Sequence, residues 1–452
     1  METIAAIATA QSPSAIGIVR LSGEETRRVL AALFTPASGM AVEALPYRRM
    51  TYGDIRSVDG TLLDRGMAVC FSAAHSYTGE ESAELHCHGS PVVLSEVLQA
   101  AFAAGARQAR PGEFTQRAFL NGKLDLTEAE AVIDLIDAET ADAAANAAGQ
   151  IAGAMRKRID PVYDSWVDIC AHFHAVLDYP DEDIDPFELS QLESALQASS
   201  QTLSALLSSC HRGRMVRSGV RITILGSPNA GKSSLLNALS GFDRVIVTDI
   251  PGTTRDTVEQ TVTLGRHLVR LVDTAGIRDT EDVIEKIGVD RSVEAAKDCD
   301  AALFVVDDSR PLTDEDRRAM DAALEAPEAI AVLNKQDLGA VIEPSDLPFS
   351  YIVPVSCKDG TGFDLLEQAF DMLFPDDAPC DGSLLTNARQ ADAIVRAKKS
   401  VDAALRSLRA GFTPDAVLVD LEAAMRALGE VTGRTMREDI TNRIFERFCV
   451  GK

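Results

Sequence analysis

The residues with the clearest chemistry form a glycine-rich loop between an apolar run and a helix-forming run. The apolar segment RITIL leads into GSPNAGKS (226–233), which the helix-forming SSLLNAL follows. Glycines let consecutive backbone N–H groups wrap around a phosphate, and the N-terminus of the next helix faces the same anion. In this pattern Lys232 reaches the β- and γ-phosphates and the Ser233 hydroxyl binds Mg²⁺. The context predicts a nucleotide-binding loop rather than a chance glycine-rich turn.

Three further motifs follow apolar runs in the order expected of a guanine-nucleotide site. HLVRLV runs into DTAG, whose Asp273 would hold Mg²⁺ through water and whose Gly276 N–H would meet the γ-phosphate. AIAVL runs into NKQD, whose Asp337 can accept two N–H bonds from guanine N1 and N2, a bidentate pairing that adenine cannot offer. The last motif is SCK (356–358), whose backbone can meet the guanine O6. Because an unpaired buried acceptor is costly, the site should select GTP over ATP.

A polar segment between the loop and DTAG supplies a further metal ligand. TDIPGTTRD contains two adjacent threonines, and we expect the Thr254 hydroxyl to bind Mg²⁺ once the γ-phosphate orders the segment. These motifs, each at the end of an apolar run, predict a guanine-nucleotide hydrolase. The residues expected to contact GTP or Mg²⁺ are Asn229, Ala230, Gly231, Lys232, Ser233, Ser234, Thr254, Asp273, Thr274, Ala275, Gly276, Asn334, Lys335, Asp337, Ser356, Cys357 and Lys358.

The residue that orients the attacking water is not settled by this pattern. Many GTPases place a glutamine directly after the D-x-x-G motif, but this chain has Ile277, whose aliphatic side chain cannot position water. A carboxylate of the following acidic segment is the alternative, and the residues alone do not choose among its members. These candidates are Asp279, Glu281, Asp282 and Glu285.

Asn229, inside the phosphate loop, has two readings of equal weight. Its side-chain oxygen can ligate a monovalent cation beside the β- and γ-phosphates, which would supply the charge that an arginine finger brings elsewhere. Asparagine also stabilises tight turns by itself. Spacing does not separate the two roles.

Length and charge limit the possible functions. The chain has 452 residues, which at roughly 150 residues per domain predicts about three domains. Its 44 Lys+Arg against 69 Asp+Glu give a formal net charge of −25, which disfavours a tight electrostatic grip on nucleic acid. Only the segment 377–452 is close to neutral. Any RNA contact therefore needs a local basic patch or the charge of a partner.

The sequence favours a cytoplasmic protein with no membrane span. No apolar run approaches the roughly 18 residues that a bilayer requires, and the first apolar stretch has no basic segment before it. Eight cysteines without a C-x-x-C pair suit a reducing compartment. The single tryptophan, Trp166, lies on a helical stretch and is expected in a core.

The pattern of residue types along the chain predicts a multidomain α/β plus all-α fold. Strand-like runs mix with a helix in the first segment, and Ala, Leu, Glu and Ile at helical spacing dominate from Pro111 to about Arg214. After Val216, β-branched runs alternate with helical stretches, which is typical of a parallel sheet with crossover helices. Helical texture returns after about Leu384, so we expect a Ras-like P-loop GTPase domain inserted into a helical domain. The predicted bounds are 1–117 for a small N-terminal α/β domain, 118–215 and 380–452 for the helical domain, and 216–379 for the GTPase domain.

Specific motifs along the whole chain resemble one family. They are GSPNAGKSSLLNAL, DIPGTTRD, DTAGIRDTEDVIEKIGVDR and NKQD in the middle, RLSG, SYTGEE, ELHCHGSP and RPGEFTQRAFLNGKLDLTEAEAV before them, and FCVGK at the end. The chain thus resembles the tRNA-uridine modification GTPases known as MnmE or TrmE. The family usually has a proline and a glycine-rich stretch near its start, whereas this chain reads AQSPSAIGIVR.

The resemblance implies a specific activity. It implies a K⁺-dependent GTP hydrolase that works with the FAD-dependent protein MnmG on C5 of the wobble uridine (position 34) of certain tRNAs. The product would carry an aminomethyl or carboxymethylaminomethyl group, with a tetrahydrofolate derivative as one-carbon donor. It further implies a homodimer, a heterotetramer with MnmG, and tRNA contact mainly through that partner.

The resemblance also carries residue roles onto this sequence. It implies that Glu285 orients the water and that K⁺ drives dimerisation of the GTPase domains. The N-terminal domain would dimerise and bind the folate, with Cys449 near it. The implied K⁺ ligands are Asn229, Thr248, Ile250 and Thr253, and the implied folate contacts are Arg20, Glu80, Lys123 and Lys452.

Two other functions compete with this one. A GTPase switch of the ribosome-assembly type shares the phosphate loop and the aliphatic residue after DTAG, but it would carry a basic RNA-binding appendage. The charge distribution argues against such an appendage. A regulatory GTPase whose hydrolysis is incidental is the third reading.

Overall fold

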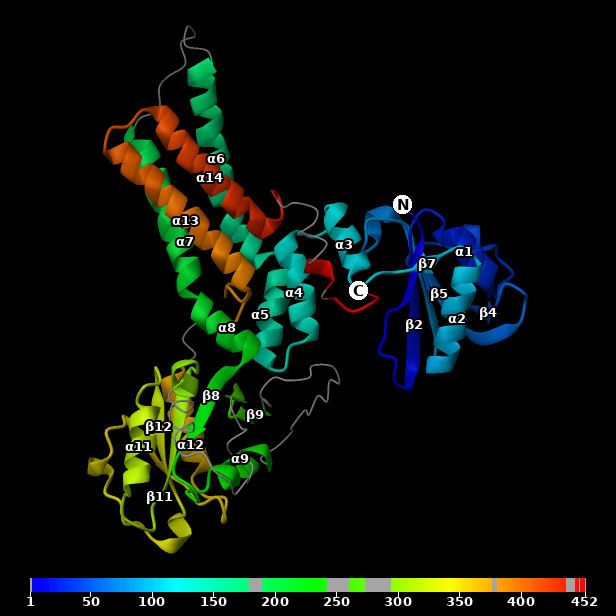
Figure 1. The fold of residues 1–452 in the computed structure, drawn as a ribbon. Helices are drawn as coiled ribbons and strands as arrows, with labels where there is room; N and C mark the ends of the chain where they lie inside the picture. The colour runs from blue at the N-terminus through cyan, green and yellow to red at the C-terminus, as the bar shows by residue number, and fades with distance from the viewer. Residues whose placement is uncertain are drawn as a thin grey trace. The chain divides into compact units, whose positions relative to one another are not determined.

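The structure is a computed structural model that describes residues 2–178, 189–241, 260–272, 294–375, 380–435, 444–446 and 448–451 (Figure 1). The chain divides into two compact units. Unit 1 comprises Met1–Asp137, Ala147–Leu207 and Ala388–Lys452, and unit 2 comprises Ala138–Asn146 and Ser208–Asn387. Unit 1 is thus built from segments on both sides of unit 2 in the sequence.

A seven-stranded sheet forms the N-terminal part of unit 1, in the strand order β3-β4-β5-β6-β2-β1-β7. Its neighbouring strands pair antiparallel except for the parallel pair of β1 with β7. Helices α1 and α2 pack on it through a shared apolar core, because the alternate residues of its central strands are apolar. The elements are β1 (Ile4–Ile7), β2 (Ser14–Ser22), α1 (Thr26–Leu33), β3 (Phe34–Pro36), β4 (Thr51–Arg56), β5 (Leu62–Phe71), β6 (Ser82–Gly89), α2 (Pro91–Ala103) and β7 (Arg107–Gln108), with short 3₁₀ turns η1 (Val42–Ala44) and η2 (Ala73–His75).

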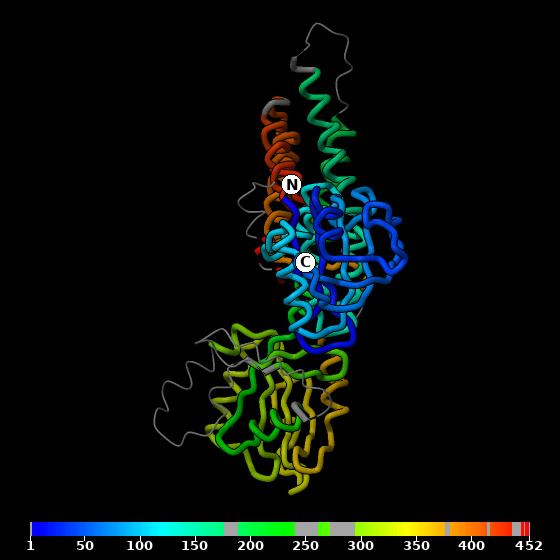
Figure 2. The backbone as a smooth tube through the Cα atoms, turned by 90° about the vertical axis from the view of Figure 1, so that its right-hand side faces the viewer, coloured from blue at the N-terminus to red at the C-terminus, as the bar shows by residue number. Residues whose placement is uncertain are grey.

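Helices make up the rest of unit 1. Helix α14, near the end of the chain, packs against α13 and against α6, which precedes the long segment Ser208–Asn387 of unit 2 (Figures 1 and 2). Trp166 on α6 is fully buried, and its Nε1 donates to Ser199 Oγ on α7 over 3.0 Å, so its predicted core position is confirmed. The helices from the start of this part onward are α3 (Glu113–Leu120), α4 (Leu126–Ile136), α5 (Ala141–Ile151), whose residues 141–146 belong to unit 2, α6 (Ala154–Asp178), α7 (Leu189–Ser208), α13 (Ala388–Arg409) and α14 (Pro414–Thr432).

A buried ion pair joins α4 to α13 in unit 1. Arg389 donates to both carboxylate oxygens of Glu130, over 2.9 and 2.8 Å, and Gln390 Nε2 donates to the same carboxylate over 2.8 Å. The Glu130 side chain is only 8% exposed. Arg389 Nη1 also donates to the Glu430 carbonyl of α14 over 2.6 Å. One arginine therefore joins α13 and α14, which are consecutive in the sequence, to α4, which lies about 250 residues before them.

Unit 2 contains a six-stranded sheet in the order β13-β12-β11-β8-β10-β9. All neighbouring strands are parallel except the β9–β10 hairpin. Apolar residues of α9 and α12 join the core on one face of the sheet, and those of α11 join the core on the other. The elements are α8 (Cys210–Ser218), β8 (Val220–Leu225), α9 (Lys232–Gly241), β9 (Gln260–Leu264), β10 (His267–Val272), β11 (Ala301–Asp307), α11 (Asp314–Ala323), β12 (Ala329–Asn334), η4 (Gln336–Leu338), η5 (Pro344–Asp346), β13 (Tyr351–Pro354) and α12 (Phe363–Leu373).

The fold class predicted from the sequence is confirmed. The N-terminal part mixes strands and helices, a helical part follows, and the later α/β part has a mostly parallel sheet with helices on both faces. The domain bounds at 117, 215 and 379 stay predictions. In the described part of the chain, no helix is both long and apolar enough to cross a membrane.

We predict that Glu130→Ala lowers the stability of unit 1 by about 3 kcal/mol, since removing one member of a buried pair leaves the other charge unpaired. Differential scanning calorimetry of the full chain measures this as a lower Tm. The control is Glu193→Ala, whose partner Arg409 is 53% exposed and whose loss should cost less than about 1 kcal/mol. Equal Tm shifts in the two variants would contradict the prediction.

Candidate nucleotide-binding site

The glycine-rich loop 226–233 lies where nucleotides bind in open α/β sheets. It leaves the carboxyl end of β8, whose neighbours β10 and β11 lie on opposite sides, so strand order reverses at this point. Gly226 has φ +158°, and a Cβ on it would lie 2.2 Å from the Val305 carbonyl oxygen. Gly231 has φ +101°, and a Cβ there would lie 2.0 Å from Asn334 Nδ2. Both glycines are required by the close approach of neighbouring groups.

The side chain of Lys232, at the start of α9, reaches back to the beginning of the glycine-rich loop. Its Nζ donates to the carbonyl oxygens of Gly226 and Ser227, both over 2.8 Å. Burial lowers the pKa of this lysine, and the negative charge of Asp316 opposes that shift. Ser233 and Ser234 follow in the first turn of α9, where backbone N–H groups lack helical partners. The loop therefore offers an ammonium, hydroxyls and N–H donors to an anion.

Asn229 has a left-handed backbone, with φ +62°. Asparagine tolerates this conformation better than most residues, which agrees with its reading as a turn residue. Its side chain is exposed and makes no hydrogen bond with the described residues, so its oxygen is also available to a cation. The structure is compatible with both predicted roles.

Asn334, at the end of β12, brings the predicted motifs together. Its Nδ2 donates to the Ala230 carbonyl in the glycine-rich loop over 3.0 Å. Its Oδ1 accepts from the N–H of Lys335 over 2.8 Å and from the N–H of Cys357 over 3.4 Å. The side chain is buried, with 2% exposed. One amide thus joins the phosphate loop, NKQD and SCK.

Asp337 lies beside SCK, as a guanine-reading carboxylate must. Ser356 Oγ donates to its Oδ1 over 3.2 Å, and Lys358 Nζ lies 3.4 Å from its Oδ2. The side chain of Lys335 turns to Asp307 at the end of β11, with Nζ 2.6 Å from Oδ2. These bonds hold the Asp337 carboxylate next to the segment 356–358, which follows β13, and the Lys335 ammonium next to the end of β11. The arrangement can accept the N–H edge of guanine.

Asp316 on α11 is a site residue that the sequence analysis missed. It is fully buried and accepts from Ser227 Oγ of the glycine-rich loop, from Arg310 Nη1 over 2.7 Å and from the Thr313 N–H over 2.9 Å. Burial alone would raise the pKa of Asp316, but the bonds from Arg310, Ser227 and Thr313 outweigh it and hold the pKa below its usual value. The Asp316 carboxylate therefore stays charged and anchors the first half of the loop. Its spacing to Thr313 shows a helix capping box, but no sequence signal shows the contact with Ser227.

The remaining predicted nucleotide and cation residues lie outside the described residues. They are Thr248, Ile250, Thr253, Thr254, Asp273, Thr274, Ala275, Gly276 and Glu285. The same holds for Lys452 among the predicted folate contacts.

The other predicted folate contacts gather around the segment 74–80 in unit 1. Arg20 on β2 has its guanidinium carbon 6.0 Å from the centre of the Tyr77 ring, and it is paired with Glu84 over 2.9 Å. Lys123 Nζ donates to the Ala74 carbonyl over 2.7 Å. Glu80 accepts from Ser22 Oγ and from Arg117 Nη1, over 3.0 and 2.6 Å. The structure thus places a guanidinium, an ammonium and a carboxylate along one short segment.

The end of the chain docks on the N-terminal part of unit 1. Val450 forms an antiparallel bridge with Pro111, and the Gly112 N–H donates to the Cys449 carbonyl over 3.3 Å. A Cβ on Gly451, at φ +102°, would lie 2.3 Å from the Ile7 carbonyl oxygen. The exposed Cys449 is therefore held against the segment that precedes α3.

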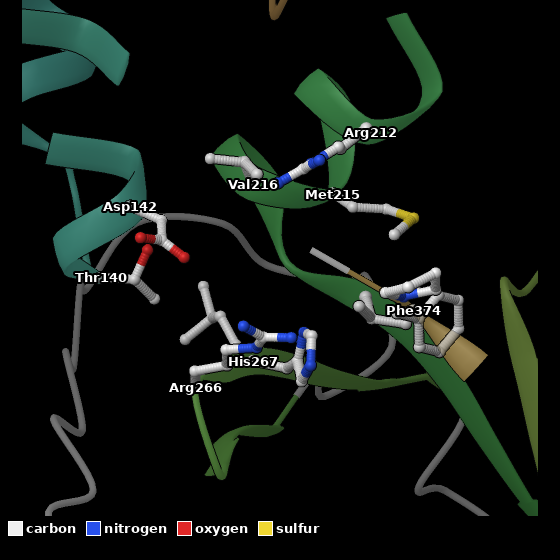
Figure 3. Close-up of a pocket in the computed structure, with 11 residues that line it drawn as sticks. Thr140, Asp142, Arg212, Met215, Val216, Arg266, His267 and Phe374 are labelled. Atoms are coloured by element: carbon white, nitrogen blue, oxygen red, sulfur yellow. The ribbon is translucent and has the colours of Figure 1, made fainter. Parts of the chain in front are cut away.

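A small pocket in unit 2 is a separate feature. Thr140 and Asp142 line one side, and Arg266 and His267 of the β9–β10 hairpin line another (Figure 3). Its volume of about 50 Å³ holds only a few waters. None of the residues that line it belongs to the nucleotide motifs, so this pocket is not the substrate site.

Comparison with known proteins agrees with these motifs along the whole chain. A family model for the GTP-binding protein TrmE N-terminus matches residues 3–123, and one for the MnmE helical domain matches residues 126–449. The tRNA modification GTPase MnmE of Roseiflexus sp. (strain RS-1) is 43% identical over 464 residues, covering 100% of this chain and 99% of the relative. That of Thermoanaerobacter sp. (strain X514) is 39% identical over 458 residues, with 100% and 99% covered.

Among solved structures, the G domain of the T. maritima FeoB iron transporter is 24% identical. The match covers 34% of this chain and 98% of that chain, with a TM-score of 0.26. A similarity at this level adds nothing to the assignment of function.

We predict that Asp316→Ala weakens GTP binding by about tenfold to a hundredfold, because it leaves Ser227 and Arg310 without their acceptor at a cost of about 1–3 kcal/mol. Calorimetric titration with a non-hydrolysable GTP analogue measures the change. The matched control is Thr313→Ala, which removes the capping bond of α11 but keeps the Ser227 anchor. That control should lose stability and keep its affinity within about twofold. Equal affinity losses in both variants would show that the contact with Ser227 has no special role.

Proposed function

The chain belongs to the MnmE family of tRNA modification GTPases, and we propose that it couples K⁺-dependent GTP hydrolysis to modification of C5 of the wobble uridine, position 34, of certain tRNAs. That it is a GTP-hydrolysing enzyme of tRNA modification follows from the family. The observation that best supports a working nucleotide site is the set of bonds that Asn334 makes to three motifs. The product would be the aminomethyl or carboxymethylaminomethyl uridine.

The proposed nucleotide chemistry uses the residues around the glycine-rich loop. Lys232 binds the β- and γ-phosphates, and Ser233 and Thr254 bind Mg²⁺. Asp273 holds the metal through water, while Thr274, Ala275 and Gly276 meet the γ-phosphate side. Asn334, Lys335 and Asp337 select guanine, together with the segment 356–358. The bonds of Ser356 and Lys358 to the Asp337 carboxylate support this role, since they orient both of its oxygens.

We propose K⁺ as the charge that stabilises the transition state. Ile277 cannot orient water, and the resemblance to the family implies that Glu285, one of the four acidic residues that follow, takes that role. The oxygen of Asn229, with Thr248, Ile250 and Thr253, would hold K⁺ beside the transferring phosphoryl group. An exposed amide oxygen without a hydrogen bond to the described residues fits a cation that prefers oxygen ligands. K⁺ would supply positive charge where negative charge builds up.

We further propose that a tetrahydrofolate derivative binds to unit 1. Its contacts would be Arg20, Glu80, Lys123 and Lys452. The donor set fits such a ligand: a carboxylate can accept N–H bonds from a heterocycle, and the cations can bind its carboxylates. The Tyr77 and Phe114 rings near the Arg20 guanidinium offer apolar faces. The folate would supply the one-carbon unit, and the docked end of the chain would hold Lys452 and Cys449 close to it.

The proposed assembly follows the resemblance. The domain 1–117 would form the homodimer, and two copies would join two FAD-dependent MnmG proteins in a heterotetramer. The segments 118–215 and 380–452 would form the helical domain around the GTPase domain 216–379. The net charge of −25 supports a division in which the partner contributes most of the tRNA affinity.

We predict that replacing Na⁺ with K⁺ raises the GTP hydrolysis rate by at least about tenfold, since the ion supplies the charge that an arginine finger supplies elsewhere. Asn229→Gly separates the two roles of this residue, because glycine adopts φ +62° without strain but lacks the amide oxygen. The variant should bind GTP and hydrolyse it at a rate that no longer depends on the cation. If Asn229→Gly keeps the full response to K⁺, the side chain serves the turn only.

We predict that tRNA from cells lacking this gene carries unmodified wobble uridines, because the proposed reaction is then absent. Mass spectrometry of nucleosides from purified tRNA tests this directly. The wild-type gene should restore the modified uridine, and Asp337→Ala, which removes the guanine acceptor, should not. Unchanged nucleosides in the deletion strain would favour a ribosome-assembly switch.

A further inference from the structure

Unit 1 has a groove between α13 and α14, and none of the residues that line it belongs to the sites proposed above. Its volume is about 560 Å³. Small side chains from both helices line it: Ser400 and Ala403 from α13, and Ala423 and Ala427 from α14. Because these side chains are short, the longer ones beside them stand above the floor of the groove. No aromatic or large aliphatic side chain lines it, so it does not suit a nucleobase or an apolar helix.

Four cations also line the groove. Arg396, Lys399 and Arg406 lie on one face of α13, at i, i+3 and i+10, and Arg426 faces them from α14. At 1.5 Å per residue the row on α13 extends over about 15 Å. Successive phosphates of one nucleic acid strand are separated by a few ångströms along the axis. The row can therefore meet several phosphates of the same strand.

Three of the four cations form no salt bridge with a described carboxylate, although the charge of Arg406 acts on Asp402 one turn before it and helps to lower the pKa of that carboxyl. Arg396 is neutralised by Glu430, with Nη1–Oε1 and Nη2–Oε2 distances of 3.1 and 2.6 Å. Lys399, Arg406 and Arg426 are exposed, and within the described part of the chain none of them forms an ion pair. Other basic residues of α13 differ in this respect, since Lys398 is paired with Asp402 and Arg409 with Glu193.

This local excess of positive charge contrasts with the net charge of −25 of the chain. Asp420 is the only acid in the lining besides Glu430, so the lining keeps a positive balance among its described residues. Exposed cations without salt bridges, beside a floor of small side chains, offer contacts to phosphate but none to base edges. Such a surface suits a polyanion whose charges repeat along a strand.

We propose that the groove between α13 and α14 binds the phosphodiester backbone of the tRNA substrate. This inference rests on the proposed function in tRNA modification and names the part of this chain that touches the RNA. Lys399, Arg406 and Arg426 each neutralise a phosphate, and the binding is independent of sequence. With three such contacts the affinity is modest and depends strongly on salt.

The test compares two triple variants of the full chain with equal net charge. The first is Lys399→Gln, Arg406→Gln and Arg426→Gln. The second is Lys297→Gln, Arg317→Gln and Arg318→Gln, which removes three exposed cations from unit 2. Fluorescence anisotropy with labelled tRNA, at 50 to 200 mM KCl, gives the dissociation constant and its salt dependence. Thermal unfolding of both variants checks that each is folded.

We expect the first variant to bind tRNA at least about tenfold more weakly at 50 mM KCl and to lower the slope of log affinity against log salt by about three. The second variant should keep the wild-type slope. Equal losses in both variants would show a general effect of charge and overturn the proposal. Loss of binding to the FAD-dependent partner with intact tRNA binding would make the groove a protein-docking surface, which also overturns it. In either case the wobble uridines of the deletion strain still report separately on the proposed function.

Discussion

The nucleotide site depends on the amide of Asn334. A single buried side chain donates to the phosphate loop and accepts from the backbone of the two segments that would read guanine. Since both ends of the amide are used, substituting either end leaves a buried backbone group without its partner. One residue therefore fixes the position of the phosphate loop relative to the two segments, 334–337 and 356–358, that would bind the guanine base. The other contacts, such as those of Asp316 with Ser227 and of Lys335 with Asp307, hold each side in place around it.

The sequence predicted the fold class and most of the nucleotide motifs because both are local patterns. Apolar runs ending in polar loops indicate a parallel sheet, and GSPNAGKS or NKQD can be read within a few residues. Asp316 was missed because its contact with Ser227 joins residues 89 positions apart, and only the packing of α11 beside the sheet brings them together. The α4–α13 ion pair was missed for the same reason, since Glu130 and Arg389 are 259 positions apart.

The two candidate sites differ in how their charged residues are held. At the nucleotide loop, the hydrogen bonds of Lys232 to described residues go to two backbone carbonyls, which a phosphate can replace as its partner. Around the segment 74–80, Arg20 and Glu80 already have charged partners, Glu84 and Arg117. A ligand there meets charges whose positions are fixed by other side chains, which lowers the entropy lost on binding. Sequence motifs give the residue types of such a site but not their partners.

The packing of α14 on α6 and α13 has a consequence for the integrity of the chain. These helices come from both sides of unit 2 in the sequence, and the Glu130–Arg389 pair adds a second link between the two sides. The two halves of unit 1 are therefore joined by noncovalent contacts as well as through the peptide chain of unit 2. A protease that nicks a surface loop of unit 2 would cut the polypeptide in two, yet the fragments would stay associated and migrate together under native conditions.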